Sequence, residues 1–150
     1  MKKILIPTDF SDCARRAEER AVALGRSLGA ELILLHVAVE TPLYNEGLRG
    51  LADPRRVYEA QREWAENTLA ARAAEIRGTG VSTHGVIRSG VAIDEILKLA
   101  VEERCDLIVI GTHGRGGLSR FFLGSVADRI VRLAPCPVMT VRLPAEETTP

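Results

Sequence analysis

The chain has 150 residues, with 20 Lys and Arg against 20 Asp and Glu, and 46% of its residues are hydrophobic. This length suits one domain whose core needs no disulfide or metal to support it. A net charge of zero argues against general binding to nucleic acid or to a membrane surface, since both favour a basic excess.

The hydrophobic residues indicate neither a membrane span nor a signal peptide. No apolar run approaches the about 18 residues that a membrane-spanning helix needs. The chain begins MKKILIP, but its apolar run stops at 7–9, too early for the core of a signal peptide. We therefore expect a cytoplasmic protein. Its cysteines, Cys13, Cys105 and Cys136, form no C-x-x-C pair, which favours isolated thiols over a zinc or redox site.

The first third of the chain predicts a strand, a helix and a second strand. The apolar run at 3–7 predicts a short buried strand. The helix after it has apolar residues three or four positions apart and ends at Gly29, which suits a left-handed cap. A second strand is expected at 31–37. The segment 38–54 has two prolines, two glycines and no period, and we expect a long surface loop there.

The middle of the chain predicts two helices around a weaker strand. The helix after residue 54 carries Trp64 among its apolar positions, which is typical of a core or interface side chain, and it ends at Gly78. The segment 81–87 alternates and predicts a half-exposed strand. Apolar residues at helical spacing predict a further helix at 92–103.

The last third predicts the most continuous apolar strand at 106–111, a helix at 125–134 and a strand at 137–142, followed by a flexible tail at 144–150. Five strands thus alternate with four helices. Strands that are apolar on both faces indicate a parallel sheet with helices on both sides. We therefore expect an α/β fold in which residues 1–150 form one open, doubly wound domain.

The connection between the last two predicted strands is unusually rich in glycine. The stretch IGTHGRGGLSRFFLGSVADRI, residues 110–130, holds five glycines and starts at the carboxyl end of a strand, where doubly wound folds bind ligands. It ends at a helix start, whose free N–H groups and dipole favour a phosphate. Gly114 and Gly124 would let the backbone approach an anion closely.

Other interpretations of this loop stay open. Gly111 can simply end a strand, and Ser125 to Asp128 fits a variant capping box that needs no ligand. His113 is equally suited to donating to a phosphate and to ordering the loop, whereas His36 and His84 lie in strands and suit structural roles. The chain has neither a P-loop motif nor the dinucleotide fingerprint G-x-G-x-x-G.

A second candidate site residue follows the first strand, in PTDFSD at 7–12. Asp9 would lie at that strand's carboxyl end, where a carboxylate can accept hydrogen bonds from ribose hydroxyls. The alternative is that Asp9 or Ser11 only caps the next helix, which is the more typical role for Ser11.

Three blocks of the chain resemble the universal stress protein family. They are ILIPTDFSD, GVAIDEIL and DLIVIGTHGRGGLSRFFLGSVADRIVRLAPCPVMTVR. The spacing G-x2-G-x9-G-[ST], at Gly111, Gly114, Gly124 and Ser125, resembles that family's ATP-binding signature. One departure is Ala92, where the family often has proline.

The resemblance implies a strand order of 3-2-1-4-5, which brings Asp9 and the glycine-rich loop to one crevice. It implies ATP as the ligand, with any Mg²⁺ held by the phosphates, and no catalytic or metal-ligating residue. Residues 7–9 would line the adenosine side, and Val37 would meet adenine. Arg115 and Arg120 would reach phosphates or stay solvated. The implied binding residues are Pro7, Thr8, Asp9, Val37, Gly111, Thr112, His113, Gly114, Arg115, Gly116, Gly124, Ser125 and Val126.

We expect a small regulatory stress-response module that binds ATP and hydrolyses it slowly or not at all. No P-loop lysine, general base or carboxylate pair for a metal is evident. The alternatives are a true ATPase or nucleotidyl-transfer enzyme of the same fold, and an interaction module that binds no nucleotide. Members of the family without the glycine signature tend to be the non-binders, so the three glycines and the serine favour ATP binding.

The strand at 137–142 is expected to lie at an edge of the sheet. Its proline stands only at its start and no charge precedes Arg142, so the edge is poorly protected against pairing with another chain. Two identical edges pair with closed two-fold symmetry. We therefore expect a homodimer centred on 138–142, as the resemblance also implies. The alternative is that the tail folds back over this edge.

Overall fold

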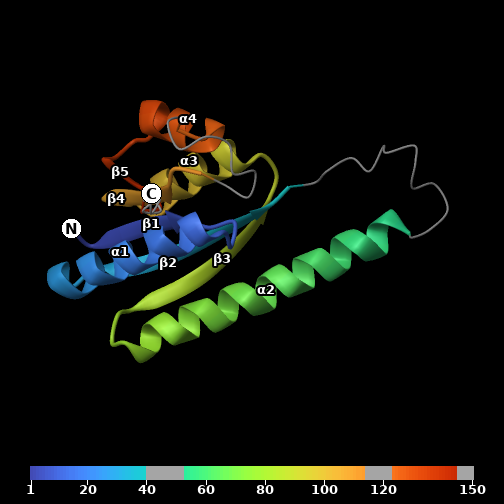
Figure 1. The fold of residues 1–150 in the computed structure, drawn as a ribbon, viewed down its shortest axis with the longest axis horizontal. Helices are drawn as coiled ribbons and strands as arrows, with labels where there is room; N and C mark the ends of the chain where they lie inside the picture. The colour runs from blue at the N-terminus through green and yellow to red at the C-terminus, as the bar shows by residue number, and fades with distance from the viewer. Residues whose placement is uncertain (40–52, 114–122, 145–150) are drawn as a thin grey trace, which may run out of the picture.

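The computed structural model describes residues 1–39, 53–113 and 123–144. Strands and helices alternate along these ranges (Figure 1). In chain order they are β1 (Lys3–Pro7), α1 (Asp12–Leu28), β2 (Glu31–Ala38), α2 (Pro54–Gly78), β3 (Thr83–Ser89), α3 (Ala92–Glu102), β4 (Leu107–Gly111), α4 (Ser125–Leu133) and β5 (Val138–Val141).

The five strands form one parallel sheet in the order β3-β2-β1-β4-β5, which confirms the expected single-domain, doubly wound α/β fold. The chain moves outward from β1 to β3 and then returns to the other side of β1 for β4. The order therefore reverses between β1 and β4, which pair in register at Ile4 with Leu107 and Leu5 with Ile108.

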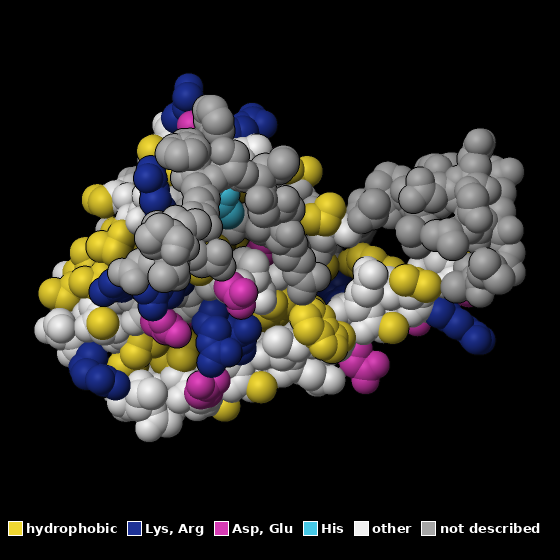
Figure 2. Space-filling model, viewed as in Figure 1, with side chains coloured by type: hydrophobic (Ala, Val, Ile, Leu, Met, Phe, Trp, Pro, Cys, Tyr) yellow, Lys and Arg dark blue, Asp and Glu magenta, His cyan; other side chains and the backbone are white. Residues whose placement is uncertain are grey.

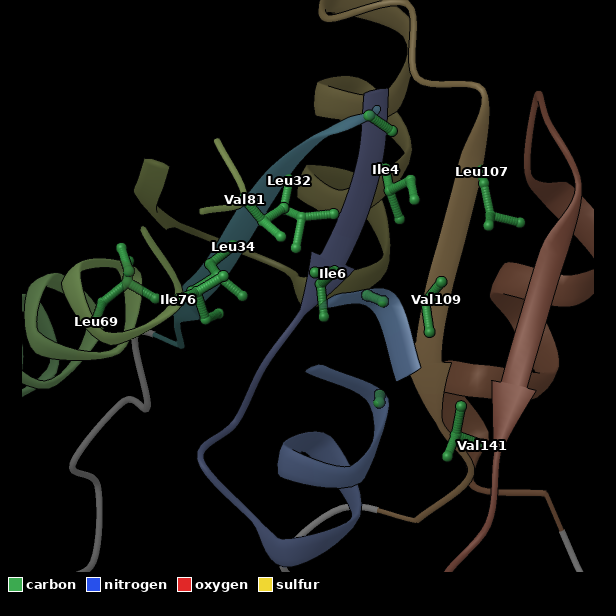
Figure 3. Close-up of a cluster of buried hydrophobic side chains, with 14 residues drawn as sticks. Ile4, Ile6, Leu32, Leu34, Leu69, Ile76, Val81, Leu107, Val109 and Val141 are labelled. Atoms are coloured by element: carbon green, nitrogen blue, oxygen red, sulfur yellow. The ribbon is translucent and has the colours of Figure 1, made fainter. Parts of the chain in front are cut away.

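Two apolar clusters cover the two faces of this sheet. One contains Ile4 and Ile6 of β1 with side chains of α1 and α2, and Figure 3 shows it. The other contains Leu5 with side chains of α3 and α4. Because successive side chains of a strand point to opposite faces, the run Ile4-Leu5-Ile6 serves both clusters, and all three side chains are 0% exposed. Figure 1 shows the two helix pairs on opposite sides of the sheet.

The third strand differs from its predicted bounds. It runs over Thr83–Ser89 rather than 81–87, because its ladder to β2 starts where Thr83 pairs with Leu32. Val81 is buried in the core but precedes the ladder. Because it is hydrophobic, the sequence pattern placed the predicted start of the strand too early. Most of the strand is half-buried, as its alternating sequence predicts.

Helix α2 is long, and only part of it is buried. Its buried residues are Ala65, Leu69, Ala73 and Ile76, which run from its middle to its carboxyl end, and the helix extends beyond the sheet in Figure 1. Trp64 is 52% exposed, so of its two predicted roles the core position is wrong, and the interface role stays a prediction. Residues 40–52 and 145–150, which cover most of the predicted long loop and tail, lie outside the described residues.

The cysteines are free thiols, and burial raises the pKa of Cys105 to about 11, which keeps it protonated at neutral pH.

No helix within the described ranges is long and apolar enough to cross a membrane. Acidic and basic side chains are interspersed on the face that Figure 2 shows.

Candidate functional site

A cleft of about 400 Å³ opens where the strand order reverses, at the carboxyl ends of β1 and β4. This is the place where open parallel sheets bind their ligands, because the helices that follow the two strands diverge to opposite faces. The residues that line it are Pro7, Thr8, Asp9, Ala14, Leu35, His36, Val37, Val39, Ala92, Ile96, Ile110, Gly111, Thr112, His113, Gly124, Ser125, Val126 and Ala127.

The structure brings the predicted site residues together wherever it describes them. The end of β1, Val37 of β2, the end of β4 and the start of α4 all line this cleft. Gly114, Arg115, Gly116 and Arg120 lie outside the described residues, so their predicted roles stay predictions. The predicted roles in ATP binding stay predictions for the lining residues too.

Sequence reasoning missed most of the apolar wall of the cleft. Val39 and the first turns of α3, with Ala92 and Ile96, line it beside the predicted residues. Their sequence pattern indicated only a surface loop for Val39 and a helix for Ala92 and Ile96. A signal did exist, because the order implied by the resemblance places the start of α3 at the same edge of the sheet. His36, to which we assigned a structural role, also lines the cleft.

The segment after β1 is held by local hydrogen bonds. The Asp9 Oδ1 atom accepts from the backbone N–H of Ser11 at 3.0 Å, and the Ser11 hydroxyl caps α1 by accepting from Ala14 at 3.2 Å. The predicted capping role of Ser11 is therefore confirmed. Asp9 supports the same turn and faces the cleft as well, so the capping and ligand-binding interpretations of this residue are compatible.

Thr112 connects β4, β5 and α4 at the base of the cleft. Its side chain is 1% exposed, its backbone N–H donates to the Val141 carbonyl at 2.9 Å, and its own carbonyl accepts from Gly124 at 2.7 Å. The Thr112 Oγ1 and His113 Nδ1 atoms are 2.8 Å apart. This contact supports the loop-ordering role of His113 and leaves its donation to a phosphate a prediction.

Helix α4 begins without a side-chain cap among the described residues. Its N-cap is Gly124, and Ser125 is already the first helical residue, so the capping-box interpretation is wrong. The first N–H groups of a helix have no partner within it, and the helix dipole adds partial positive charge there. Since Ser125 and Val126 line the cleft, this helix start gives one end of the cleft an anion-binding character.

The two described glycines of the signature have packing roles. A Cβ atom at Gly111 would lie 2.9 Å from the Cys13 carbonyl carbon, and one at Gly124 would lie 2.9 Å from the Thr112 carbonyl oxygen. Side chains at these positions would push β4 away from α1, or α4 away from β4. These glycines therefore shape the cleft by allowing its walls to approach one another.

Other polar groups of the region have defined partners. The His36 Nδ1 atom lies 2.8 Å from the Thr8 carbonyl oxygen, and His84, at the far end of the sheet, pairs with Glu31 at 3.0 Å. Within the described ranges, no three side chains of His, Cys, Asp or Glu gather as a metal site would require. The cleft thus offers one dipolar end and an extended apolar wall.

This fold, with its cleft at the reversal point, defines a doubly wound α/β protein of the kind that binds small ligands above the sheet centre. The universal stress protein family model matches residues 1–142. The chain is 35% identical over 146 residues to universal stress protein MJ0531 of Methanocaldococcus jannaschii, covering 97% of this chain and 85% of that one. The chain therefore belongs to the universal stress protein family.

Solved structures of the family share the fold. Universal stress protein UspA from Lactobacillus plantarum superposes with a TM-score of 0.81 at 26% identity, covering 94% of this chain and 97% of that chain. A universal stress protein from Archaeoglobus fulgidus, solved in complex with dAMP, superposes with a TM-score of 0.66 at 24% identity, covering 94% and 98%. At that identity the second likeness shows the fold alone.

We expect Gly111→Ala to destabilise the protein by about 1–3 kcal/mol, because the added methyl group collides with the Cys13 backbone, which cannot move without shifting α1. Urea unfolding measures the change in the free energy of unfolding. The matched control is Gly78→Ala at the end of α2, where a Cβ meets nothing within 4 Å. Equal stabilities of the two variants would contradict the packing role of Gly111.

Proposed function

We propose that this protein is a regulatory module that binds ATP in the cleft between β1 and β4. The observation that carries the proposal is the composition of that cleft, which combines a helix start at one end with an apolar wall along its length. A nucleotide has the same division, since its phosphates are anionic and its base is flat and largely apolar. The fold is shared with a family member solved with an adenine nucleotide.

Each part of the ligand then has a counterpart among the lining residues. The N–H groups at the start of α4 suit the phosphates, and the Asp9 carboxylate suits ribose hydroxyls. Val37, with Ala92 and Ile96 beside it, suits the adenine ring. The undescribed positions Gly114, Arg115 and Gly116 complete the proposed phosphate site. Any Mg²⁺ would be held by the phosphates, which bind it as they do in other nucleotide sites.

We also propose that residues 1–150 form a single functional domain. We further propose that the protein hydrolyses ATP slowly or not at all. Rapid phosphoryl transfer needs a group that positions the nucleophile and cations that stabilise the developing charge. The described lining residues include one carboxylate, Asp9, which is already engaged by the Ser11 N–H. We further propose that the protein acts in the cytoplasm.

We also propose a homodimer that forms through β5. This strand pairs with β4 on one side only, so its other edge is open within the described sheet. The Met139 side chain is 38% exposed, and Leu143 just beyond the strand is 47% exposed. Val141 belongs to the core, at 8% exposed, so among the apolar residues of this edge Met139 and Leu143 carry the proposed contact.

The test of ATP binding is the substitution Ser125→Asp, measured by calorimetry with ATP and with adenosine. Ser125 is exposed and is the first residue of α4, where a carboxylate stabilises a helix by about 0.3–1 kcal/mol. The fold should therefore persist. The new charge should repel phosphates, so we expect ATP affinity to fall about tenfold or more, equivalent to at least about 1.4 kcal/mol, and adenosine affinity to stay unchanged.

The unsubstituted protein and Ser125→Ala, which adds no charge, are the controls for this test. Wild-type protein that binds neither ligand would refute the proposed function. Equal losses of ATP and adenosine affinity in Ser125→Asp would place the phosphates away from α4.

For turnover, we expect a steady-state rate of ATP hydrolysis below about 1 per second, the lower end of ordinary enzyme rates. The measurement is phosphate release by purified protein. Protein that carries Ser125→Asp serves as the control for contaminating ATPases, since contaminants keep their activity. A faster rate that is lost in the variant would make this protein an enzyme.

For assembly, we expect wild-type protein to be dimeric in light scattering at micromolar concentration, and the double variant Met139→Lys, Thr140→Lys to be monomeric. Both side chains are exposed on β5, so the fold should persist while two added charges oppose pairing of the edges. Val101→Lys, at a 62% exposed position of α3, controls for added charge. A monomeric wild type, or a folded double variant that stays dimeric, would contradict the proposed interface.

A further inference from the structure

Phe10, which follows the cleft residues 7–9 directly, has an unusual backbone. Its φ is +63°, a left-handed conformation that bulky residues rarely adopt. Arg104 is the other non-glycine residue with positive φ in the described ranges, and it lies in a turn at the far end of the sheet. A strained conformation of this kind persists only where surrounding contacts hold it.

The Phe10 side chain has three such contacts, from two different elements. Its ring stacks on His36 of β2, with centroids 4.6 Å apart and an interplanar angle of 28°. It meets Trp64 of α2 edge-on, with centroids 5.3 Å apart at 83°. The Arg72 guanidinium, also on α2, lies 5.9 Å from the ring centroid. Aromatic pairs and cation–π contacts of these geometries are attractive.

His36 ties the same ring to the cleft. Its Nδ1 atom donates to the Thr8 carbonyl oxygen at 2.8 Å, since a carbonyl can only accept. One face of this imidazole therefore packs against Phe10 while its edge holds the backbone of Thr8, and both His36 and Thr8 line the cleft.

A polar route joins α2 to the same turn. The Thr8 hydroxyl donates to the Glu18 carboxylate at 2.8 Å, and Arg72 donates to the other oxygen of that carboxylate at 2.7 Å. The Glu18 and Arg72 side chains are 6% and 20% exposed. The Phe10 N–H in turn donates to the Thr8 hydroxyl at 3.2 Å. Arg72 thus contacts both the aromatic and the polar support of residues 8–10.

We propose that Phe10 is a positioning residue of the cleft, and that α2 controls the affinity for adenine nucleotide through it. None of the described residues that line the cleft lies on α2, so α2 acts by holding the turn that carries Thr8 and Asp9. Trp64, at 52% exposed, is the most exposed of the α2 side chains that give this support. The inference about affinity rests on the proposed function, whereas the support of the turn by α2 is a property of the protein alone.

The test is Trp64→Ala, which removes the edge-on contact without touching the cleft. Calorimetry measures the affinity for ATP, and hydrogen exchange measures the Phe10 and Ser11 amides, which bond to Thr8 and Asp9. We expect affinity to fall by about two- to thirtyfold, the range found for residues that act at a distance, and both amides to exchange faster. Trp64→Phe, which keeps an aromatic edge, should restore both quantities.

The matched control is Leu28→Ala, which truncates an apolar side chain of similar exposure, 48%, at the far end of α1. It should change neither quantity. Trp64→Leu, which keeps apolar bulk, replaces Trp64→Ala if that variant fails to fold. Unchanged exchange at Phe10 and Ser11, or unchanged ATP affinity in a protein that binds ATP, overturns the inference.

The outcomes separate this inference from the proposed function. If wild-type protein binds no adenine nucleotide, the proposed function fails and the exchange rates alone decide the positioning role. Faster exchange in Trp64→Ala, restored in Trp64→Phe, would then still support the control of the turn by α2. Exchange that matches the Leu28→Ala control would overturn it.

Discussion

The pairing of β1 with β4 at the centre of the sheet is the constraint on which the rest of the structure depends. These two strands lie far apart in the sequence, and their contact puts the reversal of strand order in the middle of the sheet. The helices that follow them, α1 and α4, then pack on opposite faces and leave a cleft between their amino ends. The proposed contacts of the phosphates and the ribose follow from this divergence.

The same constraint explains why glycines stand around the cleft. At Gly111 the end of β4 approaches the first turn of α1, and at Gly124 the start of α4 approaches the Thr112 carbonyl. Both approaches are too close for a side chain. The glycine signature resembles a set of phosphate-binding residues. At Gly111 and Gly124, however, glycine is required because the neighbouring backbone packs too closely for a side chain. The proposed binding of phosphates at α4 depends on these glycines indirectly, because they bring the helix start to the strand end.

Residues that do not line the cleft also hold its walls in place. The buried Glu18 carboxylate receives hydrogen bonds from Thr8 and from Arg72, so it joins a cleft residue to the outer helix α2. The parallel α/β fold does not itself require a buried carboxylate at this position. A buried ion pair also contributes only modestly to stability, because desolvation of the two charges offsets their attraction. Its effect here is to fix one geometry for the turn after β1, together with the strained backbone of Phe10.

The sequence by itself determined the alternation of strands and helices, both ends of α1 and the continuous core of β1, because these follow from local periodicity and capping. Through its resemblance to a family it also predicted the strand order and the strand and helix ends that line the cleft, but not most of the cleft's apolar wall. Tertiary structure alone decided that Trp64 is half exposed, that Gly124 rather than Ser125 caps α4, and that His36 supports the cleft. These features depend on contacts between residues far apart in the chain, which no local pattern records.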